Sequence, residues 1–338
     1  MNKSTQHGFS RREFLAGTSI IGAAALLGIP RTAAAEPPPE TRKVRLLETP
    51  AICLAPMYLA EQLLHLEGFS EIEYVKTTVA GPNALAAGQA DISMWDVPGT
   101  IPVLDDGEPL VMLSGIHAGC YELIGNEQIH SVRDLKGKRI GVYALRGGDH
   151  VLIASMLAYI GMNPHKDVHW VAGSQFSDAM RFFVEGKVDA FMGFAPQPQE
   201  IRAKRIGRVI VNTSQDRPWS QYFCCAVSAN KQFVAKNPIA TKRALRAFLK
   251  AADICAQEPE RVARYLVEKG YEPRYEIGLE VLKSLPYARW RQANPEDTLR
   301  FHALRLHEVG MIKSSPQQII TQGTDWRFLN ELKRELKA

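Results

Sequence analysis

The stretch Gly88-Gln89-Ala90-Asp91-Ile92-Ser93-Met94-Trp95 contains a glycine, an aspartate and then an apolar run, which predicts a helix end followed by a strand. The same order recurs at Gly186-Lys187-Val188-Asp189-Ala190-Phe191-Met192-Gly193. One such junction is common, because a helix often ends in a left-handed residue and glycine adopts that conformation at least cost. Two junctions, each inside a similar succession of strands and helices, predict two lobes of related topology.

Short apolar runs alternate with helical patterns around both junctions, which predicts α/β units with mostly parallel sheets flanked by helices. From residue 238 onward the pattern is almost wholly helical. The segments 121–124 and 222–227 should carry the chain from one lobe to the other and back. We therefore expect lobe 1 over 42–124 and 223–338 and lobe 2 over 125–222. The expected strands cover 44–48, 72–75, 91–95, 110–114, 121–124, 139–143, 168–171, 189–194, 208–211 and 222–227.

The first 35 residues have the pattern of an export signal. Arg11 and Arg12 precede an apolar stretch over 16–29, and small residues follow it up to Ala35. This order is typical of a signal peptide, and the paired arginines favour the twin-arginine route. The alternative, a buried or amphipathic first helix, does not explain the order of these features. We expect cleavage after Ala35, a disordered start over 36–41, a periplasmic location, and the twin-arginine translocase as a partner during export.

The charge balance argues against a nucleic-acid partner. The whole chain has 41 Lys and Arg against 36 Asp and Glu. The signal accounts for Lys3, Arg11, Arg12 and Arg31 against Glu13, so 37 basic and 35 acidic residues remain after it. A nucleic-acid footprint needs a basic face, which a nearly neutral chain does not indicate.

Five cysteines are present: Cys53, Cys120, Cys224, Cys225 and Cys255. An odd number in an oxidising compartment leaves at least one of them unpaired. Cys224 and Cys225 lie in an apolar run, which favours a buried strand in which cysteine acts as a small hydrophobe. A metal or redox site is the alternative, but no CxxC spacing or nearby histidine pair supports it. We therefore expect no metal and no cofactor.

Four stretches carry a resemblance to a known family. They are 55–61, just after the first strand, 87–92 and 186–191 at the two junctions, and 134–142, which opens the second lobe. In this order and spacing they resemble a periplasmic substrate-binding protein of an ABC transporter. More narrowly, the chain is similar to the nitrate, sulfonate and taurine binding proteins and their thiamine-precursor-binding relatives.

The resemblance implies a type II periplasmic-binding-protein fold, in which crossover strands join two lobes and the ligand lies in the cleft. The lobes of such proteins close by a hinge motion when the ligand binds. It also implies an ABC permease and an ATPase subunit as partners. The ligand would be a small organic molecule, such as an aromatic or aliphatic carboxylate, a sulfonate or a heterocycle.

Candidate ligand-binding residues follow the ends of the expected strands, because ligands in open α/β sheets bind beyond the carboxyl ends of strands. Aromatic residues among them would form an apolar wall with a few polar groups. Ordinary core packing is the alternative for each aromatic residue, and a structural role is the alternative for each histidine. The candidates are Cys53, Trp95, Asp96, His117, Phe194, Gln197 and, near the expected hinge, Tyr222.

The loop over 146–150 is a candidate anion site. Gly148 would let the backbone approach a ligand closely, and the following helix would present free N–H groups. Arg146 could add a bidentate contact to a carboxylate or sulfonate. As an N-cap, however, Asp149 would occupy the place of an anion and repel it. His150 completes the candidate loop.

Two other functions are alternatives to solute binding for transport. The fungal thiamine-pyrimidine synthases share the fold of the family and carry a dense cysteine cluster for iron. Phe223-Cys224-Cys225 resembles that cluster in part but lacks its other cysteines. The chain has no nucleophile elbow, HExxH motif or Walker loop, so we do not expect an enzyme. A ligand-sensing subunit of a signalling system would use the same closing cleft.

Overall fold

The computed structural model describes residues 36–49 and 51–337. In it, the sequence junctions at Gly88 and Gly186 each follow the end of a helix and precede a strand. Gly88 and Gly186 have left-handed backbones, with φ of 71° and 69°, as a helix end commonly requires. The strands that follow are β3 (Ile92–Asp96) in lobe 1 and β8 (Ala190–Phe194) in lobe 2. The expected signal, residues 1–35, lies outside the described residues.

An arginine–aspartate clamp joins two strands in each lobe. In lobe 1, Asp91 accepts hydrogen bonds from the backbone N–H of Arg45 on β1 (Lys43–Leu47), at 2.8 Å, and from its guanidinium, at 2.6 Å. In lobe 2, Asp189 accepts the same two bonds from Arg139 on β6 (Arg139–Val142), at 2.9 and 3.0 Å. The backbone N–H of each aspartate in turn donates a hydrogen bond to the backbone carbonyl of the same arginine, at 2.9 Å for Asp91 and 2.8 Å for Asp189. The two similar sequence stretches therefore make the same set of hydrogen bonds in the two lobes.

Lobe 1 contains two small sheets. Strand β1 pairs in parallel with β2 (Glu71–Val75). A second sheet has the order β3, β10 (Phe223–Asn230), β4 (Leu110–Ala118). The two sheets are separate because the N–H of Leu47 donates to the hydroxyl of Ser93 (3.2 Å) where a continuous sheet would need a backbone carbonyl. The remaining elements of the N-terminal part are η1 (Ile52–Leu54), α2 (Ala55–Leu66), α3 (Gly81–Ala86) and α4 (Val97–Asp105).

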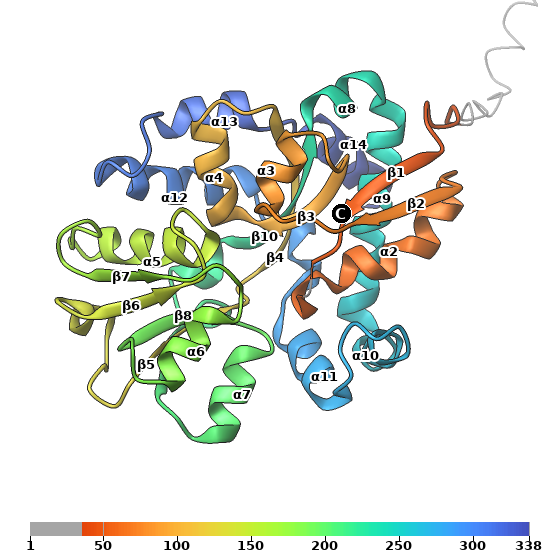
Figure 1. The fold of residues 1–338 in the computed structure, drawn as a ribbon. Helices are drawn as coiled ribbons and strands as arrows, with labels where there is room; N and C mark the ends of the chain where they lie inside the picture. The colour runs from red at the N-terminus through yellow and green to blue at the C-terminus, as the bar shows by residue number, and fades with distance from the viewer. Residues whose placement is uncertain (1–35, 50, 338) are drawn as a thin grey trace, which may run out of the picture. The chain divides into compact units, whose positions relative to one another are not determined.

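Lobe 2 contains one five-stranded sheet with the order β7-β6-β8-β5-β9. All its strands run in one direction except β5, which is antiparallel to β8 and β9. Figure 1 shows this lobe in yellow to green. Its other elements are β5 (Tyr121–Gly125), η2 (Val132–Leu135), α5 (Gly148–Tyr159), β7 (His169–Ala172), α6 (Asp178–Val184), α7 (Gln197–Lys204), β9 (Arg208–Asn212) and η3 (Trp219–Gln221).

The C-terminal part is helical after β10, as expected. Helix α9 packs against α2, and α12 packs against α5 of lobe 2. Trp290 and Tyr287 are the largest fully buried side chains of this part. Its elements are β10 (Phe223–Asn230), α8 (Lys231–Lys236), α9 (Pro238–Gln257), α10 (Pro259–Glu268), α11 (Tyr275–Ser284), η4 (Tyr287–Arg291), α12 (Pro295–Glu308), α13 (Pro316–Gly323) and α14 (Arg327–Glu335).

Two segments connect the lobes: Gly119-Cys120 between β4 and β5, and residues 213–222 between β9 and β10. The sheets are parallel except for β5 and β10, which are antiparallel to their neighbours because they carry the chain across and back. The expected boundary between residues 124 and 125 was wrong, since all of β5 pairs within lobe 2. Sequence patterns cannot assign a strand to a sheet without its hydrogen-bond partners.

The expected disordered start over 36–41 was also wrong for part of its length. The carboxylate of Glu40 accepts hydrogen bonds from the N–H groups of Ile239 and Ala240, at 2.9 and 2.8 Å. These groups lie in the first turn of α9, where a helix leaves N–H groups without an internal partner. Among the described residues, none of the helices has the length and apolar character that crossing a membrane requires.

Candidate functional site

A cleft lies between the lobes, at the carboxyl ends of β1, β3, β6, β7 and β8. It consists of an inner and an outer hollow, which share Thr49, Trp95 and Phe176. Residues of the inner hollow come from both lobes. They include Cys53, Asp96 and Cys225 from lobe 1, Tyr121, Phe176 and Phe194 from lobe 2, and Cys120 from the connection between them.

Phe176 is at the centre of the aromatic wall of the cleft. Its ring centroid lies 4.8 Å from Tyr143, 5.7 Å from Phe194 and 6.3 Å from Trp95, so it contacts aromatic rings from both lobes. The amide of Gln197 donates to the backbone carbonyl of Phe176 at 2.8 Å and fixes the loop that carries it. The rings are tilted or edge-on to Phe176, at interplanar angles of 57°, 88° and 46°, so the wall offers both ring faces and ring edges for packing against an apolar or aromatic ligand.

Asp96 is the buried acid of the inner hollow. Its carboxylate accepts a hydrogen bond from the N–H of Gly99 at 2.7 Å and so caps the first turn of α4. Burial raises the pKa of Asp96 to about 7, against the lowering effect of the Gly99 N–H. Near neutral pH this carboxyl group can therefore either donate or accept a hydrogen bond to a ligand.

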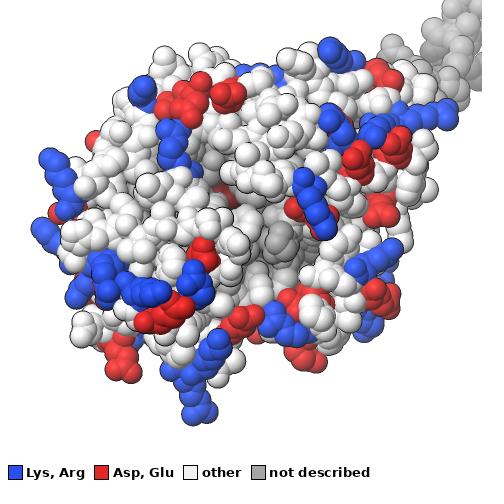
Figure 2. All heavy atoms as spheres, in the orientation of Figure 1, with Lys and Arg blue, Asp and Glu red and all other residues white. Residues whose placement is uncertain are grey.

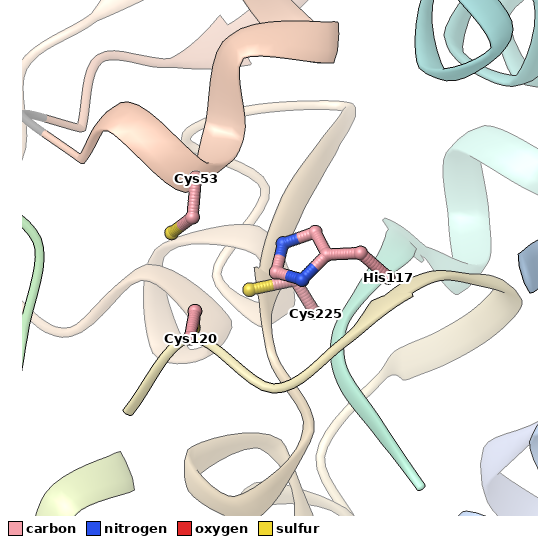
Figure 3. A group of neighbouring side chains, drawn as sticks. All are labelled: Cys53, His117, Cys120 and Cys225. Atoms are coloured by element: carbon pink, nitrogen blue, oxygen red, sulfur yellow. The ribbon is translucent and has the colours of Figure 1, made fainter. Parts of the chain in front are cut away.

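Four side chains converge at the floor of the inner hollow. The possible ligand atoms of Cys53, His117, Cys120 and Cys225 all lie within 4.8 Å of one another, and Figure 3 shows the four side chains grouped around a common space. A fourth sulfur, that of Cys224, lies 2.7 Å from the sulfur of Cys120. Thiolate sulfur and imidazole nitrogen are the ligands that zinc and other thiophilic metals prefer.

His117 has a free nitrogen in this cluster. Its Nδ1 lies 2.9 Å from the carbonyl oxygen of Gly119, to which it donates a hydrogen bond. Its Nε2 is buried and has no hydrogen-bond partner among the described residues. The fifth cysteine of the chain, Cys255, is buried in α9 and takes no part in the cluster.

A family model described as "NMT1/THI5 like" matches residues 69–262, more than half of the chain. The chain belongs to the NMT1/THI5-like family. The match covers β2 to β10 and so includes most of the cleft.

Two curated relatives of this NMT1/THI5-like chain represent different activities. It is 23% identical to the 4-amino-5-hydroxymethyl-2-methylpyrimidine phosphate synthase of Candida albicans. This match extends over 226 residues, which are 61% of this chain and 65% of that enzyme. It is also 28% identical to a putative binding protein of Brucella abortus. That match extends over 178 residues, which are 53% of this chain and 54% of that protein. The matches thus span between about half and two thirds of the relatives' length.

Solved structures share the fold of the NMT1/THI5-like chain. The periplasmic nitrate-binding protein NrtA of Synechocystis PCC 6803 superposes with a TM-score of 0.73 at 15% identity, over 89% of this chain and 90% of that one. The alkanesulfonate-binding protein SsuA of Xanthomonas axonopodis pv. citri, bound to MOPS, superposes with a TM-score of 0.66 at 17% identity. This superposition covers 83% of this chain and 96% of that one. The two-lobed periplasmic-binding-protein fold expected from the sequence is confirmed.

The structure brings several of the predicted site residues to the cleft and its cluster. Trp95, Asp96, Phe194 and Cys53 line the inner hollow. His117 belongs to the cluster beneath it. Gln197 and Gly148 contact cleft residues without lining a hollow, the first through Phe176 and the second through Asp96.

The loop over 146–150 does not present an anion site. The guanidinium of Arg146 donates to the carboxylate of Asp106 at 2.6 Å and to the carbonyl of Pro102 at 3.0 Å, outside the cleft. The N-cap of α5 is Gly147, which corrects the assignment to Asp149. The carboxylate of Asp149 accepts from the N–H of Tyr143 at 2.6 Å.

Two other predicted residues also lie away from the cleft. His150 is buried against Trp170, with ring centroids 4.4 Å apart, and burial lowers its pKa to about 4. Tyr222 stacks on Phe301 at 4.1 Å, beside the second connection between the lobes. Its position near the hinge was predicted, but its ring faces α12 and not the cleft.

Sequence reasoning missed Phe176, Tyr121 and the metal-binding potential of the cysteines. Phe176 follows the end of β7, so the rule that found Trp95 would have found it. Cys120 and Cys225 come from separate segments, and their approach to Cys53 follows from the fold alone. The spacing His117-x-x-Cys120 was the one local signal of the cluster.

Proposed function

We propose that this protein is the extracytoplasmic solute-binding component of an ABC uptake system, exported by the twin-arginine route to the periplasm. It would capture one small organic molecule between its lobes without altering it, and deliver it to a permease and an ATPase subunit. The observation that carries the proposal is the cleft, whose walls come from both lobes and meet at Trp95 and Phe176.

The connections between the lobes suit a hinge. Gly119 has φ of 65°, and a β-carbon at this position would overlap the backbone of Ser214, so the two connections touch where the lobes join. Rotation about two short, adjacent segments can close the lobes over a ligand, which is a common mode of domain closure. The cleft residues of each lobe then move as a group.

The charges of the cleft favour a planar heterocycle over an anion. No Lys, Arg or His is among the described residues that line the two hollows, whereas Asp96 and Glu48 do line them. A nitrate, sulfonate or carboxylate there would depend on backbone N–H and hydroxyl groups alone to compensate for its lost hydration. A ring with N–H or amino groups would stack on Phe176 and hydrogen-bond to Asp96. Figure 2 shows that basic and acidic side chains are interspersed on one outer face, so no single-sign field is evident there.

The test is a thermal-shift screen of the mature chain with pyrimidines and other heterocycles, aromatic acids, sulfonates and nitrate. A binder present at about a hundred times its Kd should raise Tm by about 4 °C. Phe176→Ala should abolish the shift. Phe182→Ala, which alters an aromatic residue of α6 outside both hollows, should retain it.

An enzyme is the second candidate function, because one curated relative is a pyrimidine phosphate synthase by name. Incubation of each ligand with the protein, followed by mass spectrometry, separates the two functions. Recovery of the ligand unchanged supports a binder. Conversion of the ligand at a rate that depends on an intact cleft would contradict it.

A further inference from the structure

We propose that Cys53, His117, Cys120 and Cys225 bind one thiophilic divalent metal ion, such as zinc, at the floor of the cleft. This site is additional to the organic ligand of the proposed function. Three cysteines and one histidine form a recognised donor set for tetrahedral zinc. Only one of the four ligands, Cys225, lies in the apolar run of β10; the others come from η1, β4 and the connection after β4.

The present spacing requires only small side-chain movements to bind a metal. Zinc–sulfur bonds of about 2.3 Å place the ligands of a tetrahedral site about 3.8 Å apart. All four ligand atoms already lie within 4.8 Å of one another. His117 and Cys225 are register partners on the adjacent strands β4 and β10, next to an irregularity in the pairing. A bulge of this kind lets one strand present a side chain that regular pairing would direct elsewhere.

The histidine is oriented as a metal ligand would be. Its Nδ1–H donates to the carbonyl of Gly119 at 2.9 Å, which leaves the lone pair on Nε2. That buried Nε2 has no hydrogen-bond partner among the described residues, although leaving a buried polar atom without a partner is destabilising. A metal ion in the cluster would satisfy it. The side chains that interact with this imidazole are the thiols of Cys225 and Cys53, which are members of the same cluster.

Other contacts hold the ligands in place. The hydroxyl of Tyr287 donates to the backbone carbonyl of Cys53 at 3.0 Å, and its ring lies edge-on to His117 at 5.2 Å. The sulfur of Cys224 lies 2.7 Å from that of Cys120, so the two side chains are in direct contact. Supporting hydrogen bonds of this kind fix ligand geometry and tune metal affinity.

The metal would connect the hinge to the cleft. Cys120 lies in the first connection between the lobes, and the other three ligands belong to lobe 1. Cys53, Cys120 and Cys225 also line the inner hollow. A bound ion would therefore fix one end of the hinge and set the shape of the cleft floor beneath the organic ligand.

The experiment uses the mature chain, purified without chelator and analysed for metal by mass spectrometry. The reduced, metal-free protein is then titrated with Co²⁺ as a spectroscopic probe, followed by displacement with Zn²⁺. We expect one equivalent of metal per chain and the charge-transfer absorption of a cobalt thiolate site. Cys53→Ser and His117→Gln should each weaken binding more than about 100-fold, beyond the loss expected for a supporting residue. Cys255→Ser is the matched control, since it removes a buried thiol outside the cluster, and should bind like the wild type.

Circular dichroism establishes that each variant is folded, and a Zn²⁺-dependent rise in Tm that occurs in the wild type but not in a folded cluster variant gives a second measurement. The proposal is overturned if the reduced wild-type protein binds no stoichiometric metal, or if Cys255→Ser weakens binding as much as the cluster variants do. A disulfide between Cys120 and Cys224, with no metal binding after its reduction, would overturn it as well. Solute binding is measured separately in the presence of a chelator, so its failure is distinguishable from failure of the metal site.

Discussion

Gly148 of lobe 2 packs directly against the carboxylate of Asp96 of lobe 1. A β-carbon on Gly148 would overlap that carboxylate, which is held in place as the cap of α4. We predict that Gly148→Ala forces the lobes apart at the edge of the cleft and weakens solute binding by about tenfold or more. Isothermal titration calorimetry measures the change. Gly278→Ala, in α11 where a β-carbon would lie at ordinary contact distance from Ala263 (3.9 Å) and Glu272 (4.0 Å), should leave the affinity unchanged. Equal affinities of wild type and Gly148→Ala would show that this contact does not limit closure.

His302 of α12 should make stability depend on pH. Its Nδ1 lies 3.1 Å from the hydroxyl of Ser155 on α5, and burial lowers its pKa from 6.5 to about 4. The unfolded chain therefore binds a proton near pH 6.5 while the native protein does not, so stability falls as the pH is lowered through this range. Between pH 7 and 5 this histidine should account for a loss of about 2 kcal/mol in the free energy of unfolding.

Urea unfolding at the two pH values checks this prediction. His302→Gln should reduce the difference in stability between pH 7 and 5 by about 2 kcal/mol. His307→Gln changes an exposed histidine of the same helix and should keep the wild-type difference. An unaltered pH dependence in His302→Gln would assign the effect to other groups.

Arg146→Ala should have almost no effect on ligand affinity. The Arg146–Asp106 ion pair is half exposed, and pairs of this kind contribute about 0–1 kcal/mol. We therefore expect less than about a fivefold change in Kd for any acidic compound that binds. A direct contact between Arg146 and an anionic ligand would instead cost about tenfold or more. Calorimetry with one acidic and one neutral ligand decides between these outcomes.

Gly119→Ala should destabilise the protein more than a glycine replacement elsewhere. Two effects add at this position: a left-handed backbone with φ of 65°, and overlap of the new β-carbon with the backbone of Ser214. Gly137 serves as a control for the backbone effect alone, because its φ is 73° but a β-carbon there would meet no atom within 4 Å. We expect a loss of about 1–2 kcal/mol for Gly137→Ala and a larger loss for Gly119→Ala. Denaturant unfolding of both variants measures the difference, and equal losses would mean that the connection can relax.

The sequence predicted the fold better than the site because the fold depends on local patterns. Period, capping glycines and strand ends identified the strands, and they also identified Trp95, Asp96 and Phe194 as cleft residues. Arg146 was misplaced because its type and loop suggested an anion contact, whereas Asp106, forty residues away, binds it. The cysteine–histidine cluster was missed for a similar reason. Its members are distant in sequence, and only the pairing of β10 with β4 brings Cys225 beside His117.

The repeated arginine–aspartate clamp provides an internal comparison between the two halves of the molecule. Asp91→Asn and Asp189→Asn remove the same charge from the same arrangement of donors, one in the half that carries the C-terminal helices and one in the half inserted between the connections. Each half thus serves as a reference for the other. Unequal losses of stability would measure how differently the two halves tolerate the same defect, the first through helices such as α9 packed on α2 and the second through α12 packed on α5.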